Sequence, residues 1–179
     1  MLINKRDELK IVLNSAKVCP RIIAITEITQ KFSTPATIVS EFELEWYNIF
    51  CSSLGNNNSR GVLIYVAVDL EASLVDIPTA LEECLFINVK SSSRSSNKIL
   101  IGNIYRSPNS SQNNDDNLYE LSEYIEQNFN TPKLLVGAFN FSSTQPPCSI
   151  ILRFKTAGIN ITSDVKSQFL RHALPFPLM

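Results

Sequence analysis

The sequence predicts an α/β domain in which two packed mixed β-sheets are flanked by helices. Predicted strands and helices alternate along the chain, a pattern that favours sheets with helices on their outer faces. Hairpins occur among these elements, which disfavours a purely parallel sheet. With 179 residues, of which 44% are hydrophobic, the chain can bury a core, and its length favours one domain spanning 1–179.

The first predicted elements are a helix and a buried strand. Asn4 followed by Asp7 is typical of a capped helix start. The residues after them set apolar side chains on one helical face: Leu9, Val12, Leu13 and Ala16. The helix is expected to end before Pro20. The continuous apolar run at 21–26 favours a strand buried on both faces, with Glu27 at its C-terminal end.

The middle of the chain predicts four strands. Segments 46–51 and 61–68 flank a glycine- and asparagine-rich turn at 54–60, and this arrangement predicts a hairpin. Segments 85–89 and 99–105 predict two more strands, which are separated by the polar loop 90–97.

A second helix, another strand and a short helix are predicted in the last third. The second helix is indicated by apolar residues at helical spacing: Leu118, Leu121, Ile125 and Phe129. It leads into a strand that begins near Leu134. The apolar segment 150–154 predicts a short helix that ends at Gly158. The loops at 55–60, 91–97 and 109–117 are rich in Ser and Asn and are expected at the surface.

Composition limits the classes of partner and compartment. With 16 Lys and Arg against 17 Asp and Glu, the net charge of -1 creates no global positive field, although a local basic patch would not show in that sum. The four cysteines and single histidine lack zinc-site spacing, so we expect reduced, mostly buried thiols. No apolar run approaches the ~18 residues of a membrane span. We therefore expect a soluble, intracellular protein, nuclear or cytoplasmic, with no obligate protein partner readable.

The segment Lys133-Leu-Leu-Val-Gly-Ala-Phe-Asn-Phe141 is the most informative stretch of the chain. An apolar strand runs into a glycine and then Phe-Asn, and three segments precede it in order, at 4–9, 22–27 and 104–109. Together the four segments resemble the endonuclease domain of non-LTR retrotransposons, a branch of the endonuclease/exonuclease/phosphatase superfamily. The resemblance implies a four-layer sandwich, with both sheets between helices, and Mg²⁺-dependent nicking of DNA.

The resemblance also implies roles for individual residues. Glu27 matches a metal-ligating glutamate, Tyr105 a tyrosine that hydrogen-bonds the scissile phosphate, and Asn140 an asparagine that orients phosphate and attacking water. Asn109 resembles a further polar residue of the substrate-binding loop. Ala138 stands where the family has an aspartate, and a methyl group can neither ligate a metal nor accept a proton. The matched residues have structural alternatives: a solvated strand-end carboxylate, a core aromatic and a turn residue.

Two further departures concern the ends of the family's domain. The family's first strand, which ends in a metal-site asparagine, would precede segment 4–9. The family's closing Ser-Asp-His would lie well beyond segment 137–140, whereas Ser163-Asp164 comes too soon and is followed by Val165. His172 lies beside apolar residues and is expected to be structural or exposed. We therefore expect a sandwich that is incomplete at both ends.

The expected function is that of a retrotransposon-type DNA endonuclease, weakened or inactive, with weak Mg²⁺ binding. One alternative is a catalytically silent remnant that at most binds nucleic acid or a protein partner through the old cleft. Another alternative keeps the enzyme and changes its substrate, because the superfamily also hydrolyses phosphoinositides and other phosphoesters. Plasmid nicking separates the first two hypotheses, and phosphoinositide hydrolysis would support the third.

Overall fold

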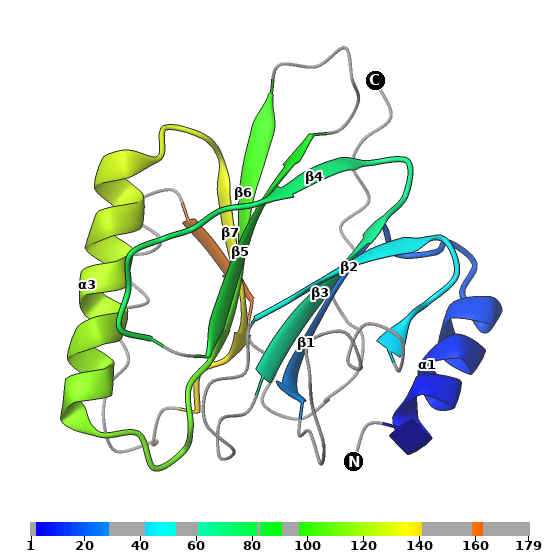
Figure 1. Cartoon of the computed structure of the whole chain (residues 1–179), viewed down its shortest axis with the longest axis horizontal. Coiled ribbons are helices and arrows are strands. Elements are labelled where there is room, and N and C mark those ends of the chain that lie inside the picture. The colour runs from blue at the N-terminus through cyan, green and yellow to red at the C-terminus, as the bar shows by residue number, and fades with distance from the viewer. Residues whose placement is uncertain are drawn as a thin grey trace.

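The chain folds into two β-sheets with a helix on the outer face of each (Figure 1). The structure, a computed structural model, describes residues 3–28, 42–52, 61–81, 83–90, 97–140 and 159–162. The predicted helix 150–154, the loops 54–60 and 91–97, and the residues Ser163, Asp164 and His172 lie wholly or mainly outside these ranges. The α/β class and the presence of two sheets are confirmed.

The smaller sheet contains β1 (Ile22–Ile28), β2 (Tyr47–Cys51) and β3 (Gly61–Ala67), in the order β1-β3-β2. Both of its pairings are antiparallel, and β2 and β3 form the predicted hairpin. The central strand β3 is buried from its first residue to its sixth, because side chains on its two faces enter two different hydrophobic clusters.

The larger sheet has the order β4-β5-β6-β7-β8. Its strands are β4 (Glu71–Leu74), β5 (Cys84–Lys90), β6 (Lys98–Tyr105), β7 (Lys133–Ala138) and β8 (Ile159–Thr162). The first two pairings are antiparallel and the last two are parallel, so this sheet is mixed. Helix α3 (Gln112–Asn128) connects the parallel strands β6 and β7, as a parallel crossover requires.

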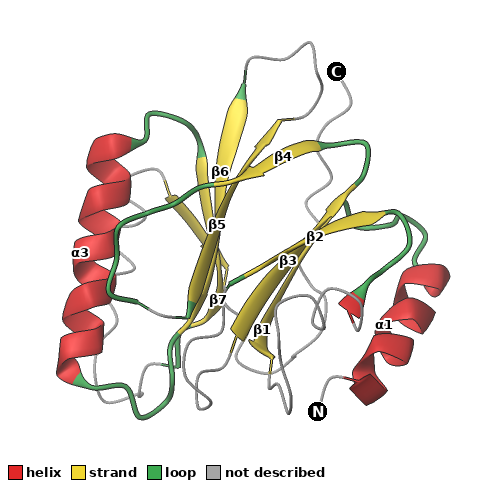
Figure 2. Cartoon of the chain, viewed as in Figure 1, coloured by secondary structure: helices red, strands yellow, loops and turns green. Residues whose placement is uncertain are grey.

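Three hydrophobic clusters hold the elements together. One joins α3 to the outer face of the larger sheet, and its members include Leu118, Leu121, Ile125 and Leu135. A second joins α1 (Ile3–Ser15) to the smaller sheet through side chains such as Leu9 and Leu13. The third lies between the sheets. The described elements therefore stack as α1, small sheet, large sheet, α3 (Figure 2). The complete four-layer sandwich of the superfamily stays a prediction, because the described residues provide one long helix on each outer face.

Several local predictions differ from the structure. Helix α1 already includes Ile3, so Asn4 lies within the helix and does not cap it. Val12, predicted on the apolar face, is 41% exposed. Ala24 is exposed in β1, which is therefore not buried on both faces. The sequence interpretation did not include β4 or β8.

The predicted burial of the cysteines is only partly correct. Cys19 is exposed, whereas Cys51 and Cys84 are half-buried, and all three are free thiols. Among the described residues, no helix is long and apolar enough to cross a membrane.

Candidate functional site

The predicted site residues lie at or just after the ends of strands, and these strands end on one side of the molecule. The C-terminal ends of β1, β6 and β7 all lie at the lower side of Figure 1, where α3 begins. β1 packs against both β6 and β7. The two sheets are also joined by the buried side chain of Asn103, whose Nδ2 donates to the carbonyl oxygens of Ile25 and Leu63 at 2.9 Å each. We call the region of Glu27, Tyr105, Ala138 and Asn140, at these strand ends, the strand-end site.

Glu27 lies in an irregular part of β1. The pairing of β1 with β3 shifts register between Ile25 and Ile28, which is the signature of a β-bulge. Glu27 has a φ of 61°, a left-handed conformation that is uncommon for a residue with a side chain, and it is half-buried. A bulge redirects the side chains at a strand end, so the direction of the Glu27 side chain depends on the bulge.

Tyr105 and Ala138 are direct neighbours at the ends of β6 and β7. They are paired in register, and both belong to the hydrophobic cluster between the sheets. Tyr105 is only 1% exposed, whereas Ala138 is half-buried. The position where the sequence resemblance implies an acid is therefore filled by a methyl group that packs on apolar neighbours, and Tyr105 offers almost no surface to a ligand.

Asn140 follows β7, whose next-to-last residue, Gly137, has a backbone conformation and a close contact that only glycine permits. Gly137 has a φ of 139°, and a Cβ at this position would lie 1.8 Å from the carbonyl oxygen of Ile104. Asn140 itself is exposed and left-handed, with a φ of 43°, a conformation in which asparagine is enriched. Its Nδ2 donates to the Arg106 carbonyl oxygen at 2.8 Å. The side-chain amide is thus tied to the end of β6.

Asn109 lies in the turn that follows β6. The backbone N–H of Ser110 donates to the Ser107 carbonyl oxygen at 3.1 Å and closes a turn with Pro108 and Asn109 at its centre. Asn109 is exposed. It shares the loop of Arg106, but the hydrogen bonds that link β6 to Asn140 run through Arg106.

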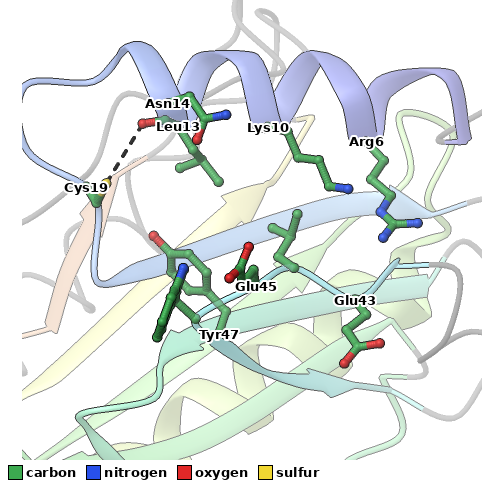
Figure 3. A pocket seen from close by; sticks show the side chains of 10 residues that line it. Arg6, Lys10, Leu13, Asn14, Cys19, Glu43, Glu45 and Tyr47 are labelled. Carbon is green, nitrogen blue, oxygen red and sulfur yellow. Dashed lines mark hydrogen bonds between the residues drawn. The ribbon is translucent and has the colours of Figure 1, made fainter.

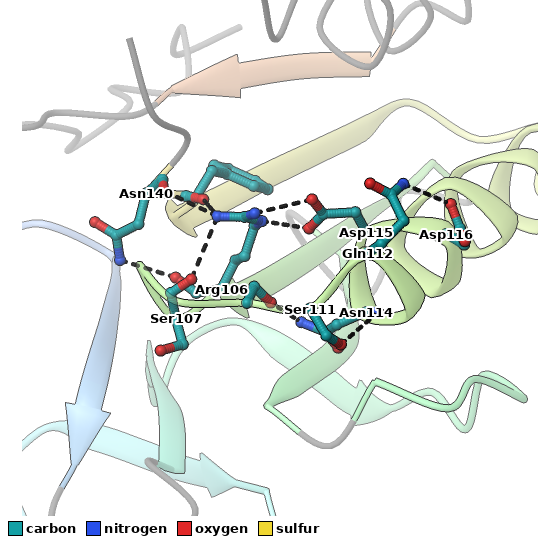
Figure 4. Close-up of polar contacts among 10 residues, drawn as sticks. Arg106, Ser107, Ser111, Gln112, Asn114, Asp115, Asp116 and Asn140 are labelled. Carbon is teal, nitrogen blue, oxygen red and sulfur yellow. Dashed lines mark hydrogen bonds and ion pairs between the residues drawn. The ribbon is translucent and has the colours of Figure 1, made fainter. Parts of the chain in front are cut away.

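Arg106 is the residue of this region that sequence reasoning missed. It is 4% exposed and pairs with Asp115 of α3 through Nε and Oδ1 at 2.6 Å and through Nη2 and Oδ2 at 2.9 Å. Its Nη1 donates to three carbonyl oxygens, those of Ser107, Phe139 and Asn140, at 3.3, 3.3 and 2.8 Å (Figure 4). A buried guanidinium therefore joins the end of β6, the segment after β7 and the first turn of α3.

The residues at the strand ends do not suit a magnesium site. Mg²⁺ in proteins is held octahedrally by oxygens, usually from one or two carboxylates together with substrate phosphates and water. Of the residues matched to the family's site, Glu27 alone is a carboxylate, and the nearby Asp115 carboxylate is occupied by Arg106. In the described part of the chain, no three His, Cys, Asp or Glu side chains gather as metal ligands.

A separate hollow of about 440 Å³ lies between α1 and the segment before β2 (Figure 3). Arg6 and Lys10 of α1 line one wall, and Glu43, Glu45 and Trp46 line the other. Cations and carboxylates balance in number here, so the hollow does not select for one sign of ligand charge. It includes none of the residues matched to the family's site.

Comparison with known proteins shows a limited similarity to solved structures. No protein-family model and no curated protein sequence matches the chain. Similar solved structures are crystal structures of TDP2 from Caenorhabditis elegans, one of them of the truncated protein, at 14% sequence identity and a TM-score of 0.47. They cover 79% of this chain, which spans 57% of the truncated TDP2 chain and 44% of the other. The function of this chain is therefore inferred from its own residues.

Proposed function

We propose that this chain is an endonuclease-type domain of the endonuclease/exonuclease/phosphatase superfamily, of the branch found in non-LTR retrotransposons, with impaired hydrolysis of DNA phosphodiesters. The family assignment is supported by the four sequence segments and their order. The impairment is supported by one observation above all: Ala138, at the position of the family's acid, is paired with Tyr105 and packs in the apolar cluster between the sheets.

Hydrolysis of a phosphodiester needs a cation to neutralise developing charge, a group that activates water, and donors that stabilise the anionic transition state. Glu27 is a candidate for a piece of the first requirement, and Asn140, whose Nδ2 is engaged by the Arg106 carbonyl, is a candidate for orienting the attacking water. Ala138 removes a carboxylate that serves the second. Loss of a general base lowers a rate by about 10²–10⁴, and losses within one catalytic unit are not additive. We therefore expect a rate at least about 10² below that of an intact relative.

The test is nicking of supercoiled plasmid DNA by the purified chain in the presence of Mg²⁺. A Glu27→Ala variant from the same preparation serves as the control for contaminating nuclease. The proposal predicts little or no conversion to the open circle above that control. Nicking at the rate of an intact endonuclease, lost in Glu27→Ala, would contradict the proposed impairment.

A catalytically silent protein that at most binds nucleic acid or a protein partner is the second candidate, and the burial of Tyr105 favours the loss of catalysis. A tyrosine that hydrogen-bonds a phosphate must present its hydroxyl to the ligand, yet Tyr105 is 1% exposed. The observation that separates the candidates is binding of a fluorescent DNA duplex without nicking. A duplex that binds and stays intact supports the silent candidate, whereas slow Mg²⁺-dependent nicking supports the impaired enzyme. An intracellular location stays a prediction for either candidate.

A further inference from the structure

Arg106 uses its guanidinium to hold the backbone on both sides of the strand-end site. Its backbone N–H donates to the Ala138 carbonyl oxygen at 2.8 Å, and its Nη1 donates to the carbonyl oxygens of Phe139 and Asn140. These bonds join the end of β6 to the segment that leaves β7. The guanidinium itself is buried, so it acts from behind the site and does not face solvent.

The contact between Arg106 and Asn140 is reciprocal. Arg106 Nη1 donates to the Asn140 carbonyl oxygen, and Asn140 Nδ2 donates back to the Arg106 carbonyl oxygen, both at 2.8 Å. In Figure 4 the Asn140 Oδ1 points away from Arg106. One end of the amide is thus fixed while its acceptor oxygen remains outside this network, on an exposed residue whose left-handed backbone is held by the same guanidinium.

Asp115 fixes the plane of the guanidinium. Both carboxylate oxygens are engaged, and such two-point pairs are more directional than single contacts. Asp115 lies in the first turn of α3, where the helix dipole favours a negative charge. Lysine could not replace this arrangement, because an ammonium is a point donor without the planar fork that reaches Asp115 and the carbonyls together.

We propose that Arg106, oriented by Asp115, is the positioning residue of the strand-end site: it holds the Asn140 amide with Oδ1 outward, where it can accept a hydrogen bond from a water molecule at the DNA backbone. This assignment rests on the proposed function for the identity of the ligand. The orientation of Asn140 is independent of the proposed function, because the two hydrogen bonds with Arg106 define it.

The test follows the side-chain amide of Asn140 by NMR in ¹⁵N-labelled protein, with the signal assigned through Asn140→Ser. We expect Arg106→Lys to shift this amide signal and to speed its exchange with solvent about tenfold or more, as loss of a hydrogen bond of this kind would. Arg21→Lys is the matched control, because Arg21 also pairs with an aspartate, Asp69. This pair is open to solvent and lies just before β1, at the end of the strand away from the strand-end site. The control should leave the Asn140 signal unchanged.

Asp115→Asn provides a second variant that keeps the guanidinium, in case Arg106→Lys does not fold. It should shift the Asn140 signal in the same direction by a smaller amount. An Asn140 signal unchanged in a folded Arg106→Lys, or in Asp115→Asn when the first variant is unfolded, would overturn the proposal, because a residue that only stabilises the fold would lower the melting temperature without moving this amide.

Duplex binding separates this inference from the proposed function. If the chain binds DNA, Arg106→Lys and Asn140→Ala should each raise the Kd about tenfold, and the double variant should be no weaker than Asn140→Ala, because the two residues act as one unit. Additive losses would overturn the positioning role. If the wild-type chain binds no DNA, the proposed function fails, and the Asn140 amide signal still decides whether Arg106 positions it.

Discussion

Replacement of Asn103 by leucine should destabilise the fold by separating the two sheets where β1 approaches the strand-end site. Asn103 is fully buried in β6, and its Nδ2 donates to a carbonyl of β1 and a carbonyl of β3. Leucine has a similar volume and keeps the position filled, so the change isolates the hydrogen bonds. Both carbonyl oxygens lose the donor that crosses from the other sheet.

The magnitude follows from the polar groups that gain or lose partners. A buried carbonyl that loses its donor costs about 1–3 kcal/mol, and two carbonyls are affected. The Oδ1 of Asn103 has no hydrogen-bond partner among the described residues, so its removal returns about 1–3 kcal/mol. The net loss of unfolding free energy is therefore about 2 kcal/mol, and for a chain of this length the melting temperature should fall by about 4–8 °C.

Urea and thermal unfolding followed by circular dichroism measure this change. Asn128→Ala is the matched control, because Asn128 also donates its Nδ2 to a carbonyl, that of Tyr124 at 2.8 Å, but on the exposed surface of α3. The control should change the unfolding free energy by less than about 0.5 kcal/mol. A leucine variant as stable as the wild type would show that Asn103 does not hold the sheets together.

Three further changes test other parts of the structure. Gly137→Ala should cost more than about 3 kcal/mol in chemical unfolding, because its Cβ would meet the Ile104 carbonyl at 1.8 Å in a conformation that disfavours side chains, and a wild-type midpoint would contradict this close approach of β7 to β6. Burial raises the pKa of Cys84 to about 11 and that of Tyr65 to about 12, so both groups stay neutral in the folded chain where the unfolded chain ionises. The unfolding free energy should therefore be level up to about pH 8.5 and fall as the pH rises from about 9 to 12, and no fall over that range would be inconsistent with their burial. Ala138→Asp alone should remain inactive in plasmid nicking, because it restores one member of a unit that lacks several; robust nicking that disappears on adding Glu27→Ala would make position 138 the sole lesion.

The regular elements were largely predictable because their patterns are local. The hairpin of β2 and β3 follows from two apolar runs around a glycine- and asparagine-rich turn, and α3 follows from apolar residues at helical spacing. β4 was missed because its side chains are mostly exposed and it is held by pairing with β5, including the ion pair between Lys90 and Glu71 at 2.6 Å. No local sequence pattern predicts such an edge strand. β8 did carry a signal, because Ile-Asn-Ile-Thr at 159–162 alternates as a strand does.

The sequence predicts site residues only where they match the motifs of a known family. Glu27, Tyr105 and Asn140 were named from the sequence, and the structure adds the bulge at Glu27 and the burial of Tyr105. In the sequence, Arg106 is recognisable only as part of segment 104–109. Its pairing with Asp115, nine residues later, depends on how α3 docks beside β6, and the same holds for its bonds to the segment after β7. Such long-range polar contacts leave no periodicity in a sequence.

Calorimetric titration of the purified chain with Mg²⁺ tests the central claim most directly, because hydrolysis needs a bound cation as well as a water-activating group, and the residues assigned to the strand ends are an incomplete set of ligands for that cation. One assigned carboxylate, Glu27, next to the methyl group of Ala138, predicts no binding tighter than about millimolar, since Mg²⁺ gives up its water only to several well-placed oxygens. A micromolar site that is abolished by Glu27→Ala would contradict the claim and would mean that another acid supplies the missing ligand.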